Sequence, residues 1–271
     1  NNASVGGAPS SAGCAYVYSG GTGALMHVMR SPCEMESGRF GVCAAAVPDV
    51  DGDGLPDIAI GAAYETSGTS PFSAGRVHLF SGRTGGLLRT LVSPNEVPSG
   101  NFGYSVSGLE DIDGDGRGDL VVGAPYEDLN IAPARRGCVY VISGATGTCI
   151  RTVYSPNPAK WGFFGFSVSG IPDVNNDGKW DFLVCTTLSS ADPHAYVFSG
   201  ANAMLLRTVT FSGRESTYSV GSSVSWTPDI NQDGVPDVLI GDPDGNAQQG
   251  RVYVVSGVDG AAIRTLSSPN Q

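Results

Sequence analysis

The chain has 271 residues, of which 41% are hydrophobic and 15% are charged, and its formal net charge is −11 at pH 7. So few charges exclude a disordered acidic tail, and no apolar run approaches the length that spans a bilayer. The 39 glycines and 17 prolines suit a fold with many tight turns.

The first predicted element is a β-hairpin at residues 13–20 and 25–29. Both stretches alternate between apolar and polar side chains, and a glycine-rich turn separates them. Neither a Phe-Gly element nor an acidic loop precedes this hairpin. It therefore reads as the outer part of a larger unit.

Four similar units follow, and each has the same parts in the same order. A Phe-Gly element (Val220-Gly221 in the fourth unit) opens an alternating stretch, an acidic loop comes next, and an apolar strand and a hairpin complete the unit. A repeat of this length predicts a propeller, solenoid or array. Four short antiparallel strands expose two faces, and radial packing buries both, so we predict an all-β fold, a β-propeller of four-stranded antiparallel blades.

We expect one domain over residues 1–271. Its predicted parts are a partial blade at 1–33 and complete blades at 34–94, 95–156, 157–212 and 213–271.

The acidic loops share one pattern, and their first residues lie 62, 62 and 56 positions apart. Oxygen ligands at positions 1, 3 and 5 with Gly at position 6 are typical of Ca²⁺ loops; the position-7 carbonyl and the position-9 Asp would complete the shell. The predicted ligands of loops 1 to 4 are Asp49, Asp51, Asp53, Leu55 and Asp57; Asp111, Asp113, Asp115, Arg117 and Asp119; Asp173, Asn175, Asp177, Lys179 and Asp181; and Asp229, Asn231, Asp233, Val235 and Asp237.

An EF-hand shares the first half of this pattern but needs a bidentate Glu at position 12. Here that position is aliphatic in every copy, and position 9 runs into a short strand-like stretch instead of a helix. The position-12 residues are Ile60, Val122, Val184 and Ile240. We therefore reject the EF-hand.

Four bound Ca²⁺ ions would bring the net charge to about −3. Most of the acidity is thus ligand charge, and stability should depend on Ca²⁺. Asn175 and Asn231 are neutral, so loops 3 and 4 should bind Ca²⁺ more weakly than loops 1 and 2. Ca²⁺ at millimolar levels is extracellular.

The Phe-Gly element, the calcium loop and Gly123-Ala-Pro125 together resemble FG-GAP repeats, the blades of the N-terminal β-propeller of integrin α subunits and of many bacterial extracellular proteins. The resemblance covers residues 13–271. It implies loops that join the first and second strands of each blade, on the face opposite the usual ligand-binding surface. The first, third and fourth units each depart from the pattern at one element.

Two closures fit four blades and a partial one: a compact five-part ring, which we favour, or a piece of a larger propeller. Ser268-Pro269-Asn270 matches Ser93-Pro94-Asn95, which stands seven residues before the next Phe-Gly.

Arg117-Gly118-Asp119 spells an adhesion tripeptide, but Asp119 is a predicted metal ligand, so we do not expect adhesive use. The outer hairpin strands repeat an arginine, which we interpret as facing solvent and discouraging edge pairing. These residues are Arg89, Arg151, Arg207 and Arg264.

Two disulfides are plausible, Cys138 with Cys149 across a hairpin and Cys33 with Cys43, while Cys14 and Cys185 read as buried thiols. Loop aromatics could anchor a ligand or pack between blades; they are Tyr64, Tyr126 and Trp161. Trp180 would shield loop 3.

None of the three histidines stands in a nucleophile motif, so no catalytic residue is predicted. Glutamates outside the loops, including Glu65 and Glu127, leave sugar chemistry open. We expect a secreted or surface-exposed Ca²⁺-stabilised scaffold that recognises an extracellular protein or glycan, without nucleic-acid binding or membrane insertion. The alternatives are a carbohydrate-binding module and part of an extracellular polysaccharide-active enzyme.

Overall fold

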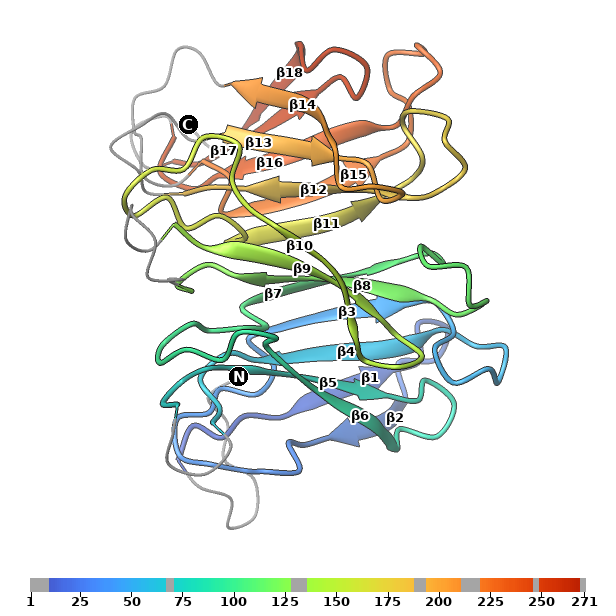
Figure 1. Ribbon diagram of the computed structural model, residues 1–271. Helices are drawn as coiled ribbons and strands as arrows, with labels where there is room; N and C mark the ends of the chain where they lie inside the picture. The colour runs from blue at the N-terminus through green and yellow to red at the C-terminus, as the bar shows by residue number, and fades with distance from the viewer. Residues whose placement is uncertain are drawn as a thin grey trace.

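The computed structural model describes residues 10–66, 71–127, 136–187, 194–210, 220–245 and 249–268. These residues contain eighteen β-strands in five separate sheets (Figure 1). The predicted all-β fold with four-stranded antiparallel blades is confirmed. In the described part of the chain no helix is long and apolar enough to span a membrane.

The partial blade pairs β1 (Ala15–Tyr18) with β2 (Leu25–Met29). Blade 1 contains β3 (Cys43–Val47), β4 (Asp57–Ala62), β5 (Arg76–Phe80) and β6 (Leu87–Val92). Blade 2 contains β7 (Ser105–Leu109), β8 (Asp119–Ala124), β9 (Cys138–Ser143) and β10 (Cys149–Val153). Blade 3 contains β11 (Ser167–Ile171), β12 (Asp181–Cys185), β13 (His194–Phe198) and β14 (Leu205–Thr210). Blade 4 contains β15 (Ser223–Thr227), β16 (Asp237–Asp242), β17 (Arg251–Val255) and β18 (Ala262–Ser267).

Within each sheet, every strand pairs with its chain neighbours in antiparallel order, so each blade is a meander. Strands in the middle of a blade are covered on both faces: all six residues of β8 are buried. The outer strand β6 instead alternates between exposed and less exposed side chains. This difference explains why the second strand of each unit reads as a continuous apolar run.

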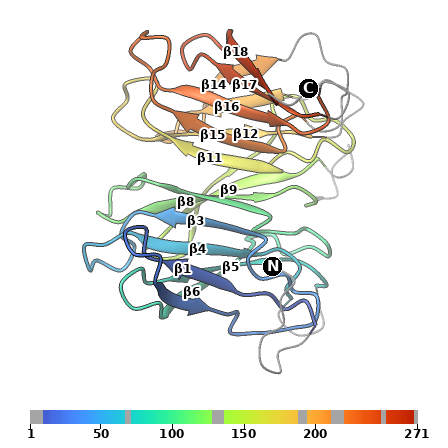
Figure 2. The same ribbon diagram turned by 180° about the vertical axis from the view of Figure 1, so that it is seen from behind.

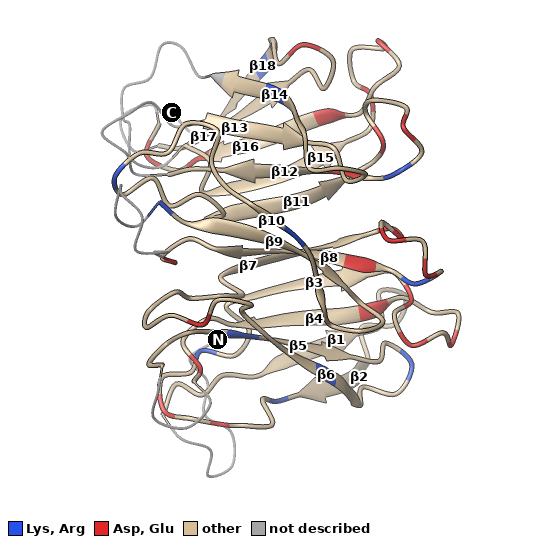
Figure 3. Cartoon of the chain, in the orientation of Figure 1, with Lys and Arg blue, Asp and Glu red and all other residues tan. Residues whose placement is uncertain are grey.

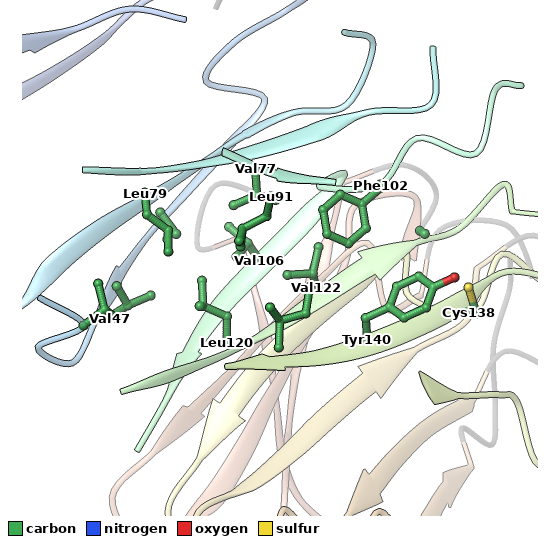
Figure 4. Packing of buried hydrophobic residues seen from close by; sticks show 14 residues of the cluster. Val47, Val77, Leu79, Leu91, Phe102, Val106, Leu120, Val122, Cys138 and Tyr140 are labelled. Atoms are coloured by element: carbon green, nitrogen blue, oxygen red, sulfur yellow. The ribbon is translucent and has the colours of Figure 1, made fainter. Parts of the chain in front are cut away.

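The core lies between blades. The inner strands contact one another in the order β3, β7, β11, β15. Figure 4 shows the interface of blades 1 and 2, where Val77 and Leu79 of β5 lie opposite Leu120 and Val122 of β8, beside Phe102. Each blade therefore buries one face against the next, as a radial repeat requires.

The two ends of the array are exposed. Figures 1 and 2 place the partial blade at one end and blade 4 at the other. Leu266 of β18 is 46% exposed, whereas its counterparts in blades 1 to 3 are at most 5% exposed. These counterparts are Leu91, Val153 and Val209. The preference for a closed five-part ring was therefore wrong for the described residues, because the outer face of blade 4 is left uncovered.

Repeated hydrogen bonds tie each blade to the next. Ser105 Oγ donates to the Gly165 carbonyl at 2.9 Å, and Ser167 Oγ donates to that of Gly221 at 2.6 Å. Each acceptor is the glycine of the next unit's Phe-Gly element, which explains why this element marks the start of every blade.

The interpretation of the repeated arginines as solvent-facing groups was wrong for three of them, because Arg207 Nη1 is buried in blade 3 and the other two bond the next blade. Arg89 Nη2 donates to the Ala145 carbonyl of blade 2 at 2.5 Å, and Arg151 donates to the Ala201 carbonyl of blade 3. His27 of the partial blade lies 3.3 Å from the Gly82 carbonyl in the same way. Arg264, in the last blade, is exposed. Tertiary packing gives this position a role that its alternation does not reveal.

The predicted disulfides are absent among the described residues, where all six cysteines are free. The register of β9 and β10 places Cys149 opposite Ile142, while Val153 lies opposite Val139, next to Cys138. A cross-strand disulfide needs its two residues opposite each other. The Cys138–Cys149 prediction failed because it counted the turn and not the register.

Candidate metal loops

The four acidic loops each join the first strand of a blade to its second strand, at residues 49–57, 111–119, 173–181 and 229–237. Figure 3 shows acidic residues grouped in these loops along one edge of the array. The strands begin at the position-9 Asp in every case, so the sheet fixes that end of each loop. We call them loops 1 to 4.

The first Asp of each loop organises the turn. Asp49 Oδ2 accepts the Gly54 N–H at 2.8 Å, while Oδ1 accepts the N–H groups of Gly52 and Asp53. Gly54 has φ = 84°, a left-handed conformation that favours glycine. Loops 2 to 4 repeat the bond from the position-6 N–H to the first Asp.

The last Asp of each loop is buried and bridges two segments. Asp119 Oδ2 accepts the Ile112 N–H at 2.7 Å, and Oδ1 accepts the Gly144 N–H at 3.1 Å. The same pair of bonds occurs in the other three loops. This Asp therefore joins the loop to the turn between the third and fourth strands.

The Asp at position 5 has one carboxylate oxygen that accepts a hydrogen bond from a backbone N–H of the loop. Its other oxygen accepts a hydrogen bond from a side chain outside the loop. Asp177 Oδ1 accepts the Lys179 N–H, and its Oδ2 accepts the Ser199 hydroxyl at 2.8 Å. A serine occupies this place in loops 2 and 4 as well. Loop 1 differs, because Arg83 Nε donates to Asp53 Oδ2 at 2.8 Å.

The donor chemistry fits a hard cation. In each of loops 1 to 3, carboxylate oxygens of three aspartates lie within 4.8 Å of one another. The groups are Asp49, Asp51 and Asp53; Asp111, Asp113 and Asp115; and Asp173, Asp177 and Asp181. Loop 4 brings no three acidic groups that close among the described residues. Asp57 and Asp119 stand outside the close groups.

Two opposite effects set the pKa values in the loops. Burial raises the pKa of Asp119 to about 6, against the opposing effect of the Ile112 and Gly144 N–H groups. Burial also acts to raise the pKa of Asp49, but the Gly54 and Gly52 N–H groups and the Arg117 guanidinium outweigh it and lower that pKa. A bound cation would favour the ionised form of both carboxyls.

Sequence reasoning missed the conformational demand at loop position 4. Gly52 and Gly114 have φ = 87°, and the non-glycine residues Asn176 and Gln232 at the same position have φ of 61° and 63°. The glycines in two of the four copies were the available signal. Loops 3 and 4 thus contain backbone strain that loops 1 and 2 avoid.

The loop aromatics lie at the opposite ends of the strands and pack between blades. Tyr126 lies 4.8 Å from Phe163 between ring centroids, Tyr104 lies 4.9 Å from Phe166, and the Arg39 guanidinium lies over Tyr64 at 4.6 Å. Burial, with neighbouring tyrosines, raises the pKa of Tyr104 to about 12. This aromatic cluster also presents Trp161, which is 44% exposed, to solvent.

Trp180, which was predicted to shield loop 3, has further neighbours outside that loop. Its ring meets Trp226 edge-on at 6.4 Å, and it lines a cavity of about 380 Å³ together with Asp49, Gly54 and Leu55 of loop 1. Trp180 therefore lies beside loop 1 as well as within loop 3.

Two glutamates left open for catalysis are buried. Glu65 Oε2 lies 2.8 Å from His78 Nε2, and both side chains are at most 1% exposed. Glu127 accepts bonds from Ser93, Tyr140 and the Cys138 thiol. Each carboxyl connects its loop to the third strand of its own blade.

The adhesion tripeptide is also closed off. Asp119 and Gly118 are buried, and the Gly118 N–H donates to the Asp49 carbonyl at 3.0 Å. A receptor cannot reach this carboxylate without unfolding the loop.

Comparison with known proteins places this geometry in a family. A model of the FG-GAP repeat matches residues 40–80, 102–142 and 220–255. The chain therefore contains integrin-like FG-GAP repeats. The matches cover the first, second and fourth repeats of the FG-GAP array, including the fourth repeat, where Val220 replaces Phe. They omit the third, in which Cys185-Thr-Thr replaces the Gly-Ala-Pro element.

The FG-GAP chain is 33% identical to integrin alpha-8 of Mus musculus over 180 residues, or 62% of this chain and 16% of that protein. It is 34% identical to integrin alpha-2 of Mus musculus over 156 residues, 54% of this chain and 13% of that protein. Integrin alpha-5 of Xenopus laevis is 30% identical over 161 residues, 56% of this chain and 15% of that protein. The aligned part therefore spans only 13–16% of each of these relatives.

Proposed function

We propose that this protein is a secreted or cell-surface Ca²⁺-binding β-propeller module that serves as a recognition or adhesion scaffold. The observation that carries the proposal is the common geometry of the four loops. In each loop the first Asp accepts a hydrogen bond from the backbone N–H at position 6, and the last Asp is the first residue of the second strand. The similarity to integrin α subunits supports an extracellular adhesion role. In this role the metal is structural and no residue is catalytic.

The ligands would come from positions 1, 3, 5 and 9 and the carbonyl at position 7 of each loop, one Ca²⁺ per complete blade. The bound ion would neutralise carboxylates that otherwise repel one another. With a dissociation constant of about 0.1 mM and about 1 mM Ca²⁺, each site would add roughly 1.4 kcal/mol of stability. Four such sites would be comparable with the net stability of a domain.

Calcium titration of chelator-treated protein tests this proposal. We expect up to four sites by isothermal titration calorimetry and a higher melting temperature in Ca²⁺ than in EDTA. Asp113→Ala should remove one site, while Glu36→Gln, an exposed change outside the loops, should remove none. An unchanged melting temperature after chelation would refute the structural role of the metal.

A glycan ligand is the second candidate, supported by the exposed Trp161 at the edge of the aromatic cluster. The module would then bind carbohydrate, alone or as part of a polysaccharide-active enzyme. Glycan-array binding that Trp161→Ala abolishes would favour this candidate over a protein ligand. The matched control is Trp226→Ala, an exposed tryptophan near the metal loops. A polysaccharide activity screen would test the enzyme.

A further inference from the structure

Loop 1 differs from the other loops in its electrostatic surroundings. Arg83 Nε lies 2.8 Å from Asp53 Oδ2, and Arg83 Nη2 donates to the Asp53 backbone carbonyl at 2.9 Å. The guanidinium thus makes two bonds to one candidate ligand residue. Such charge-assisted bonds are the strong ones, even though the Arg83 side chain is 54% exposed.

A second guanidinium approaches loop 1 from blade 2. Arg117 Nη1 lies 3.7 Å from Asp49 Oδ2, and its guanidinium covers the α-carbon of Gly52 on the side where a side chain would stand. Only glycine at loop position 4 leaves this space. The nearest corresponding group at loop 2 is Lys179, whose ammonium bonds the Asp111 backbone carbonyl at 2.5 Å and not a carboxylate.

The other loops use a neutral group where loop 1 uses Arg83. Serine hydroxyls face the position-5 Asp in loops 2, 3 and 4. Arg83 lies in the turn between β5 and β6, and the corresponding residue in the turn between β9 and β10 of blade 2 is Ala145. Within the described ranges, a guanidinium lies within 4.0 Å of a candidate ligand carboxylate only at loop 1. Arg207 acts on Asp233 of loop 4 only from a greater distance. The four sites are therefore not electrostatically equivalent.

We infer that Arg83 and Arg117 act as built-in counterions of loop 1, which lower its affinity for Ca²⁺ and hold it in place when the metal is absent. This inference rests on the proposed Ca²⁺ binding. The positive charges of the guanidinium groups partly neutralise the carboxylates of Asp53 and Asp49, and they repel an incoming dication. Loop 2 keeps four carboxylates without a paired guanidinium, so it fills first as Ca²⁺ rises.

Arg83→Gln separates the two effects, because glutamine keeps a hydrogen-bond donor and loses the charge. We expect this variant to bind Ca²⁺ at loop 1 about three to ten times more tightly. Its melting temperature should fall in EDTA, while the gain in melting temperature on adding Ca²⁺ should grow. Arg117→Gln should act in the same direction. A merely structural arginine would lower both melting temperatures equally.

The matched control is Arg264→Gln, which makes the same charge change at an exposed position in the last blade; it should leave both readouts unchanged. A double-mutant cycle with Asp51→Ala, measured by isothermal titration with CaCl₂, assigns the effect to loop 1. If the tighter binding arises there, Arg83→Gln should no longer change Ca²⁺ affinity in the Asp51→Ala background. Ca²⁺ binding with an unchanged or weakened loop 1 in Arg83→Gln would overturn this inference alone. Absence of Ca²⁺ binding by the unmodified chain would overturn the proposed function as well.

Discussion

Arg89 of blade 1 reaches across the blade interface to the Ala145 carbonyl of blade 2, 2.5 Å away. Gly147 leaves room for it, since a Cβ there would come 2.7 Å from Arg89 Cδ. We expect Arg89→Gln to lower the free energy of unfolding by about 1 kcal/mol, because the variant loses a charged donor at a partly exposed site. Urea unfolding checks this. Arg264→Gln, the exposed counterpart, should change it by less than about 0.5 kcal/mol.

The free energy of unfolding should depend on pH through the buried carboxyl of Glu127. Burial raises the pKa of this carboxyl, and hydrogen bonds from Ser93, Tyr140 and Cys138 oppose but do not cancel the shift. The folded state therefore holds the proton more tightly than the unfolded chain. The resulting stability is present below the unfolded pKa of about 4.3 and is lost as the pH rises through the folded value.

Glu127→Gln should flatten this part of the stability curve, whereas Glu36→Gln, at an exposed position, should not. The measurement is the urea midpoint between about pH 4 and pH 8 at constant Ca²⁺. The same slope in both variants would contradict the assignment to Glu127.

Replacing Gln232 with glycine should stabilise the protein. This exposed residue has φ = 63° at a position where loops 1 and 2 have glycine. Gln232→Gly should raise the free energy of unfolding by about 0.5–1 kcal/mol, because the left-handed strain exceeds the entropic cost of glycine. Asn176→Gly should gain less, since asparagine tolerates this conformation. Thermal melts of the two variants give the order, and the reverse order would argue against strain.

A substitution at Asp119 measures how much the last loop residue stabilises the metal-free protein. Both of its oxygens accept buried backbone N–H groups, so in Asp119→Asn the amide would face one of these donors. We expect a loss of about 2–3 kcal/mol by chemical unfolding in EDTA. Asp115→Asn, an exposed change in the same loop, should cost far less. Selective loss of cell attachment with normal stability would instead restore the adhesive reading of the tripeptide.

The cysteines give a chemical prediction. Unreduced, denatured protein should react with six equivalents of a thiol reagent. In native protein the exposed Cys33 and Cys149 should react first, while Cys185 should be slow because burial raises its pKa to about 12. Fewer than six reactive thiols would contradict the six free cysteines of the structure.

Sequence alone determined the features that depend on near neighbours. The alternation of apolar residues predicted the strands. The spacing from Asp49 to Asp57 predicted a loop that leads directly into β4. Gly54 marked the left-handed position because only a residue without Cβ adopts that conformation freely. Each signal lies within ten residues, so periodicity and turn chemistry could reveal it.

Tertiary structure decided the contacts between distant segments. Strand register separates Cys138 from Cys149, and blade packing gives Arg89 its acceptor 56 residues away. Arg83 reaches Asp53 across 30 residues, and this contact distinguishes loop 1 from chemically similar loops. Such pairs depend on how complete sheets pack, because a side chain's partner across an interface is set by the position of another blade and not by its own neighbours in sequence.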